Sequence, residues 1–205
     1  DWVRAMAQQR HDHRVPALRG SAYPLPLRDN SVDAAMAVVT VHHWDDELEP
    51  GVRELRRVAR GPVIVVTYDP AVSAQMWLTR DYLREAARLD YETFPSIEKL
   101  ERWLGGAVTT EAVLTPRDSP DWNFASFWAH PERVLDGAAR KATSSFSRMD
   151  PDVVARVTSE VERDLRSGAW DERNGHLRAM TEFDAGMRLV LSRPERAAAI
   201  SAATA

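Results

Sequence analysis

Two nearly continuous apolar runs on either side of an amphipathic stretch constrain the fold of this chain more than any other feature. Residues 32–41 read Val-Asp-Ala-Ala-Met-Ala-Val-Val-Thr-Val, and residues 63–66 read Val-Ile-Val-Val. Continuous rather than alternating hydrophobicity is typical of parallel strands that are covered on both faces. Residues 45–60 between them predict a helix with an apolar stripe of Leu48, Val52, Leu55 and Ala59. We therefore expect a βαβ unit, and with it a parallel sheet and a right-handed crossover.

Further elements are expected on both sides of this unit. Apolar spacing and capping residues predict helices over residues 1–9 and 73–89, from Ser96 to Gly105, and from Asp150 to Gly168. Short apolar runs predict strands over residues 15–18, 108–114 and 186–191. Residues 118–128 are aromatic-rich and irregular, and the Ala/Ser-rich tail after Pro194 is expected to fray.

Composition narrows the classes of partner and compartment. The chain has 205 residues, a formal net charge of −4 and no basic stripe, so neither nucleic acid nor an anionic membrane is expected as a partner. No cysteine is present, which excludes a disulfide framework and thiolate zinc sites and favours a reducing cytoplasm. No apolar run approaches the length of a membrane span, and no signal peptide is recognised at the start. We expect a cytoplasmic protein that acts on a small-molecule substrate.

Three segments in register resemble class I S-adenosylmethionine-dependent methyltransferases. Residues 20–27 read Gly-Ser-Ala-Tyr-Pro-Leu-Pro-Leu and residues 29–33 read Asp-Asn-Ser-Val-Asp, where the family has Gly-x-Ala-x-x-Leu-Pro-Phe and Asp-x-Ser-Phe-Asp. Residues 41–44, Val-His-His-Trp, resemble the family's Leu-His-His at the end of its fourth strand. Residues 54–61, Glu-Leu-Arg-Arg-Val-Ala-Arg-Gly, resemble its Glu-x-x-Arg-Val-Leu-Arg-Pro-Gly.

The second half of the chain is similar to a bacterial small-molecule subgroup of these type 11-like methyltransferases. The similar segments are Phe-Trp-Ala-His-Pro-Glu at 127–132, Ser-Gly-Ala-Trp at 167–170 and Gly-His-Leu-Arg at 175–178. The resemblance implies an α/β fold, namely a doubly wound, Rossmann-like sheet with extra helices before its last strand. It also implies three parts: a partial cofactor-binding core at 1–116, a helical substrate-cavity segment at 117–184, and the last strand and tail at 185–205.

One part of the family pattern is not found. Family members have a glycine-rich turn after the first strand and an acidic residue after the second, which hold the methionine portion and the ribose of the cofactor. Neither is found before Gly20, and Asp1 corresponds to a position past the second strand. The resemblance therefore implies that the first βαβ unit is missing from this sequence. We expect an exposed sheet edge, and binding of S-adenosylmethionine by the full-length protein but poorly or not at all by these residues alone.

The resemblance also assigns cofactor-binding positions. Ser21, Ala22 and Leu25 would contact adenine, although they could equally form a simple turn before a strand. The cofactor's methionine portion would lie against a strand end made of Val39, Thr40 and Val41, whose side chains could also be plain core.

Candidate catalytic residues follow the two expected parallel strands. His42 and His43 are adjacent, so their side chains diverge, and one of them could take a proton from the substrate or instead cap the next helix. Asp69 could pair with a histidine or bind substrate, or else cap the helix that Asp69-Pro70 begins. Many methyltransferases need no strong base, because in-line positioning supplies much of the acceleration.

Aromatic residues are the candidates for the substrate cavity, with core packing as the alternative for each of them. They are Tyr68, Trp77, Trp122, Phe124 and Trp128. No catalytic metal is expected, because His11 and His13 lack further ligands nearby and fit a solvated loop.

The expected activity is methyl transfer from S-adenosylmethionine to an O, N or C nucleophile of a small molecule. Two other functions stay open. A nucleotide-dependent oxidoreductase would need a Gly-x-Gly-x-x-Gly turn, and a catalytically inactive methyltransferase-like subunit would act through a protein partner. The oligomeric state also stays open, a homodimer included.

Overall fold

The computed structural model describes residues 20–120 and 123–194. Several predictions lie outside these ranges, namely the helix over 1–9, the strand over 15–18, the loop with His11 and His13, Trp122, and the tail from residue 195.

The predicted strand–helix–strand unit is present. Strand β1 (Ala35–Val38) pairs in parallel with β2 (Val63–Tyr68), and helix α2 (Leu48–Val58) connects them. Two 3₁₀ turns, η1 (Val41–His43) and η2 (Asp45–Glu47), lead into α2. The parallel pairing confirms the βαβ unit and the α/β fold class.

The remaining strands complete a mixed sheet with the order β1-β2-β6-β3. Strand β6 (Met187–Arg193) runs antiparallel to both β2 and β3 (Ala107–Ala112). The described sheet is therefore not wholly parallel. Within the described residues β1 pairs with β2 alone, and its Met36 and Val38 side chains are 65% and 50% exposed.

Strand β1 is shorter than the apolar run that predicted it. Val39 has a φ of 45°, a left-handed conformation that a β-branched residue adopts only under constraint, and it ends the extended backbone. The chain then turns into η1, which contains Val41, while Val32 forms only an isolated parallel bridge with Ala59. The predicted ten-residue strand is thus reduced to four residues.

The predicted helix over residues 73–89 is broken into three pieces. These are α3 (Pro70–Ser73), the π-helical turn η3 (Leu78–Tyr82) and α4 (Arg84–Thr93). Leu78 and Leu83 are fully buried at the two ends of the π-helical turn. Burial of this turn in the protein interior overrides the helical periodicity of the sequence.

Two helices have the boundaries that glycine predicts. Helix α5 (Ile97–Leu104) is followed by Gly105 and Gly106 at positive φ, and α8 (Pro151–Ser167) ends at the left-handed Gly168. The predicted side-chain caps are not made, because neither the Ser96 nor the Asp150 side chain bonds to its helix terminus.

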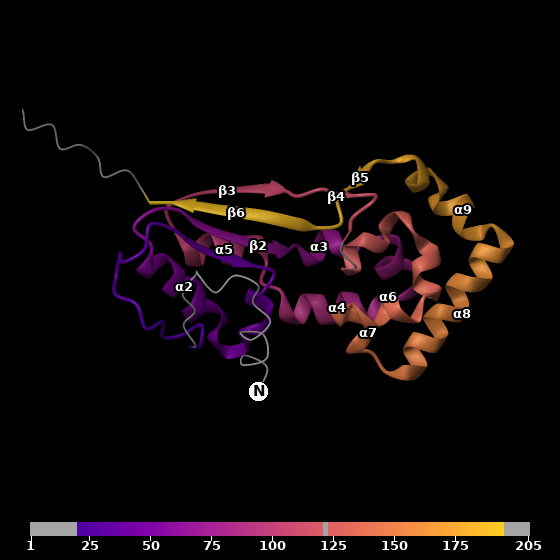
Figure 1. Ribbon diagram of the computed structural model, residues 1–205, viewed down its shortest axis with the longest axis horizontal. Helices are drawn as coiled ribbons and strands as arrows, with labels where there is room; N and C mark the ends of the chain where they lie inside the picture. Colours follow the sequence, from indigo (N-terminus) through magenta and orange to yellow (C-terminus); the bar gives the residue numbers. More distant parts are fainter. Residues whose placement is uncertain (1–19, 121–122, 195–205) are drawn as a thin grey trace, which may run out of the picture.

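The rest of the chain forms a largely helical region at the end of the molecule opposite α2 (Figure 1). It leaves the sheet at β4 (Thr115–Pro116) and returns at β5 (Glu182–Phe183), and these two short strands pair antiparallel. The division at 116/117 and 184/185 stays a prediction. The remaining elements are η4 (Phe124–Ala129), η5 (Pro131–Leu135), α6 (Gly137–Lys141), α7 (Ser144–Ser147), α9 (Ala169–Asn174) and η6 (Gly175–Ala179).

Two hydrophobic clusters hold these regions together. The sheet core is aliphatic, with Val52, Val63, Val65, Leu100 and Val190 among its buried members. The helical core is aromatic, and its largest buried members are Trp77, Phe127, Trp128, Phe146 and Trp170. No helix in the described ranges has the length and apolar character needed to span a membrane.

Candidate active site

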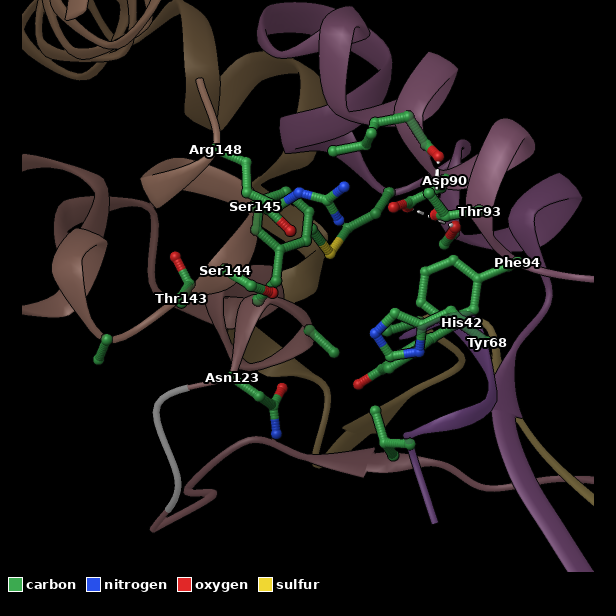
Figure 2. Close-up of a pocket in the computed structure, with 18 residues that line it drawn as sticks. His42, Tyr68, Asp90, Thr93, Phe94, Asn123, Thr143, Ser144, Ser145 and Arg148 are labelled. Atoms are coloured by element: carbon green, nitrogen blue, oxygen red, sulfur yellow. Dashed lines mark hydrogen bonds between the residues drawn. The ribbon is translucent and has the colours of Figure 1, made fainter. Parts of the chain in front are cut away.

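A cavity of about 180 Å³ lies between the carboxyl ends of the parallel strands and the helical region. Figure 2 shows His42, Tyr68 and Phe94 on one side of it, and Asn123, Thr143 and Ser144 on the other. Carboxyl ends of parallel strands are where open α/β sheets bind their ligands. The other lining residues are Val39, Ser73, Met76, Leu89, Asp90, Thr93, Phe124, Ala125, Ala142, Ser145, Arg148 and Ala185.

His42 is the histidine that faces this cavity. Its ring stacks on Phe94 with the centroids 4.2 Å apart, and it also contacts the ring of His43. Burial, together with the charges of His43 and Arg148, lowers the pKa of His42 to about 4. His42 is therefore neutral near pH 7 and a poor general base there, and its buried Nδ1 has no hydrogen-bond partner among the described residues.

His43 points away from the cavity. Its side chain is exposed and is not among the lining residues, so one of the two histidines faces the cavity, as predicted. The two side chains do not diverge, however, because their ring centroids are only 3.8 Å apart. Its predicted catalytic role has no support in this placement.

Asp69 takes the capping role that the sequence left open. Its carboxylate accepts a hydrogen bond of 3.0 Å from the backbone N–H of Ala71 at the start of α3. The side chain borders a different surface hollow, together with Tyr91 and Ser96. The structure therefore shows the capping alternative, and Asp69 is not among the residues that line the cavity, so its catalytic role stays a prediction.

The predicted aromatic residues divide between the cavity and the core. Tyr68 and Phe124 line the cavity. Trp77 and Trp128 are buried in the helical core instead, where Trp77 Nε1 donates a 2.9 Å hydrogen bond to the Trp128 carbonyl oxygen. Trp128 stacks on Phe183, so the substrate-binding prediction for these two tryptophans is corrected to core packing.

Asp90 is a cavity residue that the sequence did not reveal. Burial raises the pKa of this carboxyl to about 6, against the opposing influence of a Ser73 hydrogen bond and the Arg148 charge. Asp90 follows the buried Ala86 by four residues on α4, which places both on the inward face of that helix. An acidic residue on the apolar face of an amphipathic helix was the signal that could have found it.

Arg148 is the second residue that sequence reasoning missed. It follows α7, and Figure 2 shows its guanidinium pointing into the cavity on the side of Asp90. Arg148 lies just before the helix predicted to begin at Asp150, so no helical periodicity indicates which way its side chain faces. Only the tertiary fold brings it to the same space as α4.

The segment predicted to contact adenine is hydrogen-bonded to α2 and to the residue that precedes this helix. The Ser21 hydroxyl donates to the Glu47 carboxylate, and the backbone N–H of Leu25 donates 2.7 Å to Glu54 Oε2. Glu54 is held in turn by Arg57, with Nε 2.5 Å from Oε1. Ala22 packs so closely on α2 that a Cβ added at Gly51 would lie 3.0 Å from its own.

The three residues predicted at the strand end have different environments. Val39 lines the cavity, Thr40 precedes η1 and is half-buried, and Val41 is fully buried in the sheet core. Val41 can offer a ligand its backbone only.

The described residues fit one side of an S-adenosylmethionine molecule. Residues 21–25 and Val39 flank the same turns, η1 and η2, and the neutral His42 does not repel a positively charged sulfonium. In the described ranges no glycine-rich turn leads from a strand into a helix. The contacts that such a turn provides in the family are therefore not supplied by this part of the chain.

Comparison with known proteins agrees with this geometry. Residues 2–66 match the family described as a methyltransferase domain, a stretch that includes β1, α2 and most of β2. A crystal structure of a proposed methyltransferase from an antibiotic biosynthesis pathway of Anabaena variabilis ATCC 29413 is 28% identical, with a TM-score of 0.81. That match covers 92% of this chain and 77% of the other. No curated protein matches the chain.

Two further solved structures are more distant. The cyclase SpnF is 19% identical with a TM-score of 0.44, over 95% of this chain and 60% of its own. A proposed methyltransferase from Bacillus halodurans C-125 is 12% identical with a TM-score of 0.42, over 89% of this chain and 79% of its own. Neither likeness bears on function.

The fold, the cavity at the strand ends and the match over residues 2–66 support a methyltransferase. More specifically, they support a methyltransferase of the class I type, the family that the sequence resembles.

Proposed function

We propose that this protein transfers the methyl group of S-adenosylmethionine to an O, N or C nucleophile of a small molecule held in the cavity. The observation that carries the proposal is the position of the cavity, which has one wall at the ends of β1 and β2 and the other in the helical region. In this position a substrate would lie beside the strand end to which the family resemblance assigns the cofactor.

Residues 21–25 would hold the adenine, and Val39 with Thr40 the methionine portion. When bound, the cofactor supplies an electrophilic methyl group on a sulfonium sulfur. The chain's own contribution is positioning and exclusion of water. Tyr68, Phe94 and Phe124 give the cavity apolar walls that orient a ring and keep water away from the reacting atoms.

A small-molecule substrate and a cytoplasmic location belong to the same proposal. The cavity is close in size to an engineered cavity of about 150 Å³ that binds benzene, so it admits roughly one ring with a short substituent. The net charge of −4 gives no attraction for nucleic acid, and the lack of cysteine suits a reducing compartment.

The test separates cofactor binding from substrate binding in the protein as its gene encodes it. Calorimetric titration of S-adenosylhomocysteine measures the first, and release of that product from S-adenosylmethionine with a panel of one-ring phenols and amines measures the second. Micromolar binding is expected, together with turnover of at least one acceptor. A folded protein that does not bind S-adenosylhomocysteine contradicts the proposal.

A matched pair of variants, one in α6 and one directly after it, tests the cavity itself. Ala142 lines the cavity and is exposed, so Ala142→Trp should fill it, abolish turnover and leave S-adenosylhomocysteine binding intact. Ala138 is exposed within α6 but does not line the cavity, and Ala138→Trp should behave as wild type. Equal turnover in the two variants would place the substrate elsewhere.

A further inference from the structure

Two side chains of opposite charge face the cavity without pairing with each other. Asp90 comes from α4 and Arg148 from the end of α7 (Figure 2). Arg148 acts on Asp90 through its charge, yet no ion pair or hydrogen bond joins the two among the described residues. A carboxylate and a guanidinium that share one small cavity and leave each other unpaired can each bind a ligand group.

The Asp90 carboxylate is mostly buried and weakly satisfied. Its single hydrogen bond among the described residues comes from Ser73 Oγ to Oδ2, at a long 3.4 Å. Oδ1 makes no hydrogen bond with a described residue, and Asp90 lines the cavity. A buried carboxylate costs free energy unless a donor or a positive charge satisfies it, so this wall favours an amine or hydroxyl of a ligand.

Arg148 is unlike the other arginines of the helical region. Arg156, Arg173 and Arg178 each form ion pairs with acidic side chains. The guanidinium of Arg148 makes no hydrogen bond or ion pair with any described residue, although it is directed into a cavity. Its planar array of donors matches a carboxylate or phosphate.

We propose that the cavity takes a small zwitterionic substrate of the aromatic amino-acid kind, with its amino group held by Asp90, its carboxylate by Arg148 and its ring among Tyr68, Phe94 and Phe124. This inference rests on the proposed function, because it names the class of methyl acceptor. The aromatic rings suit both the ring of such a ligand and its cation. His42, which stacks on Phe94, is neutral near pH 7 and repels neither charge.

The test compares three probes that share one phenyl ring. L-Phenylalanine carries both charged groups, phenethylamine only the amine, and 3-phenylpropanoate only the carboxylate. Calorimetry on the wild-type protein should give the tightest binding for L-phenylalanine, by about tenfold or more over either single-charge probe, as expected for one charge-assisted hydrogen bond.

Two variants assign each group to its partner. Asp90→Asn should weaken L-phenylalanine and phenethylamine by about tenfold or more and leave 3-phenylpropanoate unchanged. Arg148→Gln should weaken L-phenylalanine and 3-phenylpropanoate and leave phenethylamine unchanged. The matched controls Asp152→Asn and Arg102→Gln change exposed residues on α8 and α5 and should alter no affinity.

Three results would overturn the inference. One is that no probe binds to wild-type protein, and another is that each variant weakens all three probes alike. The third is an equal decrease of the melting temperature in both variants without any change in probe binding, which would mean that Asp90 and Arg148 pair with each other in solution.

Titration of S-adenosylhomocysteine in the same samples distinguishes the failure of this inference from the failure of the proposed function. If S-adenosylhomocysteine binds and the probes do not, the proposed zwitterionic substrate is contradicted and methyl transfer is still supported. If the probes bind as expected and S-adenosylhomocysteine does not bind, methyl transfer is contradicted instead.

Discussion

The sheet core and the helical core of this protein are built in opposite ways. The sheet core is aliphatic, and much of it comes from the β1-α2-β2 unit, in which the contacting residues are close in sequence. The helical core gathers three tryptophans, Trp77, Trp128 and Trp170, from segments that are far apart along the chain. The ring centroids of Trp77 and Trp170 are only 5.3 Å apart.

This difference explains which residues form the cavity. One wall comes from the ends of the locally determined strands, through Val39, His42 and Tyr68. The other lining residues come from α4, η4 and the α7 region, whose positions depend on long-range packing. The substrate side of the site is therefore set by the helical core, while the strand side is set by the βαβ unit.

The largest expected effect is on stability and comes from truncating the helical core. Trp128 is fully buried, so Trp128→Ala should lower the free energy of unfolding by about 3–5 kcal/mol. Val65→Ala in the sheet core removes less volume and should cost about 2 kcal/mol. Urea unfolding measures both, with Tyr91→Ala, at a residue 57% exposed, as the neutral control. An equal decrease in the free energy of unfolding for Trp128→Ala and Val65→Ala would contradict the expected difference between the two cores.

The next effect concerns a polar network on the surface of the helical core. The Asp164 carboxylate accepts a 2.8 Å hydrogen bond from Tyr82 and pairs with Arg173 at 2.5 Å. Asp164→Asn should therefore cost about 2 kcal/mol near pH 7. The Arg173 hydrogen bond is the main cause that lowers the pKa of Asp164, so its contribution exists above the unfolded pKa and is lost as the pH falls through the folded pKa. Urea unfolding across acidic pH should show the variant and wild type converging, and a gap that persists in acid would contradict the assignment.

The smallest expected effect is an increase in stability, and it comes from Asp90 in the cavity. Because burial raises the pKa of Asp90 to about 6, the folded protein binds a proton there that the unfolded chain releases. Wild-type stability from this group is greatest below the unfolded pKa of about 4 and falls as the pH rises to about 6. Asp90→Asn should consequently stabilise the protein above pH 6, by about 1 kcal/mol after allowance for partial exposure. Thermal unfolding at acidic and neutral pH measures this, and destabilisation at neutral pH would mean that Asp90 has a structural partner.

Local signals predicted the elements whose interactions are local. The apolar runs and the stripe of α2 predicted the βαβ unit, and Gly105, Gly106 and Gly168 marked helix ends, because left-handed backbone suits glycine almost alone. The motif around His42 also placed that residue at the ligand-binding edge of the sheet. These features depend on a residue and its near neighbours in sequence.

The tertiary structure decided what periodicity does not encode. The sequence did not indicate that β1 ends at Val38, that η3 interrupts a helix, or that β6 lies between β2 and β3. It also could not assign Trp77 and Trp128 to the core, since an aromatic side chain packs equally well against a ligand or against protein. Asp90 and Arg148 are 58 positions apart in the sequence and line the same cavity only because the tertiary fold brings α4 and the α7 region to it. By itself, the sequence determined the sheet unit and indicated a resemblance to a methyltransferase domain. The long-range packing of aromatic side chains determined which charged groups face the cavity, because their proximity depends on contacts between distant segments.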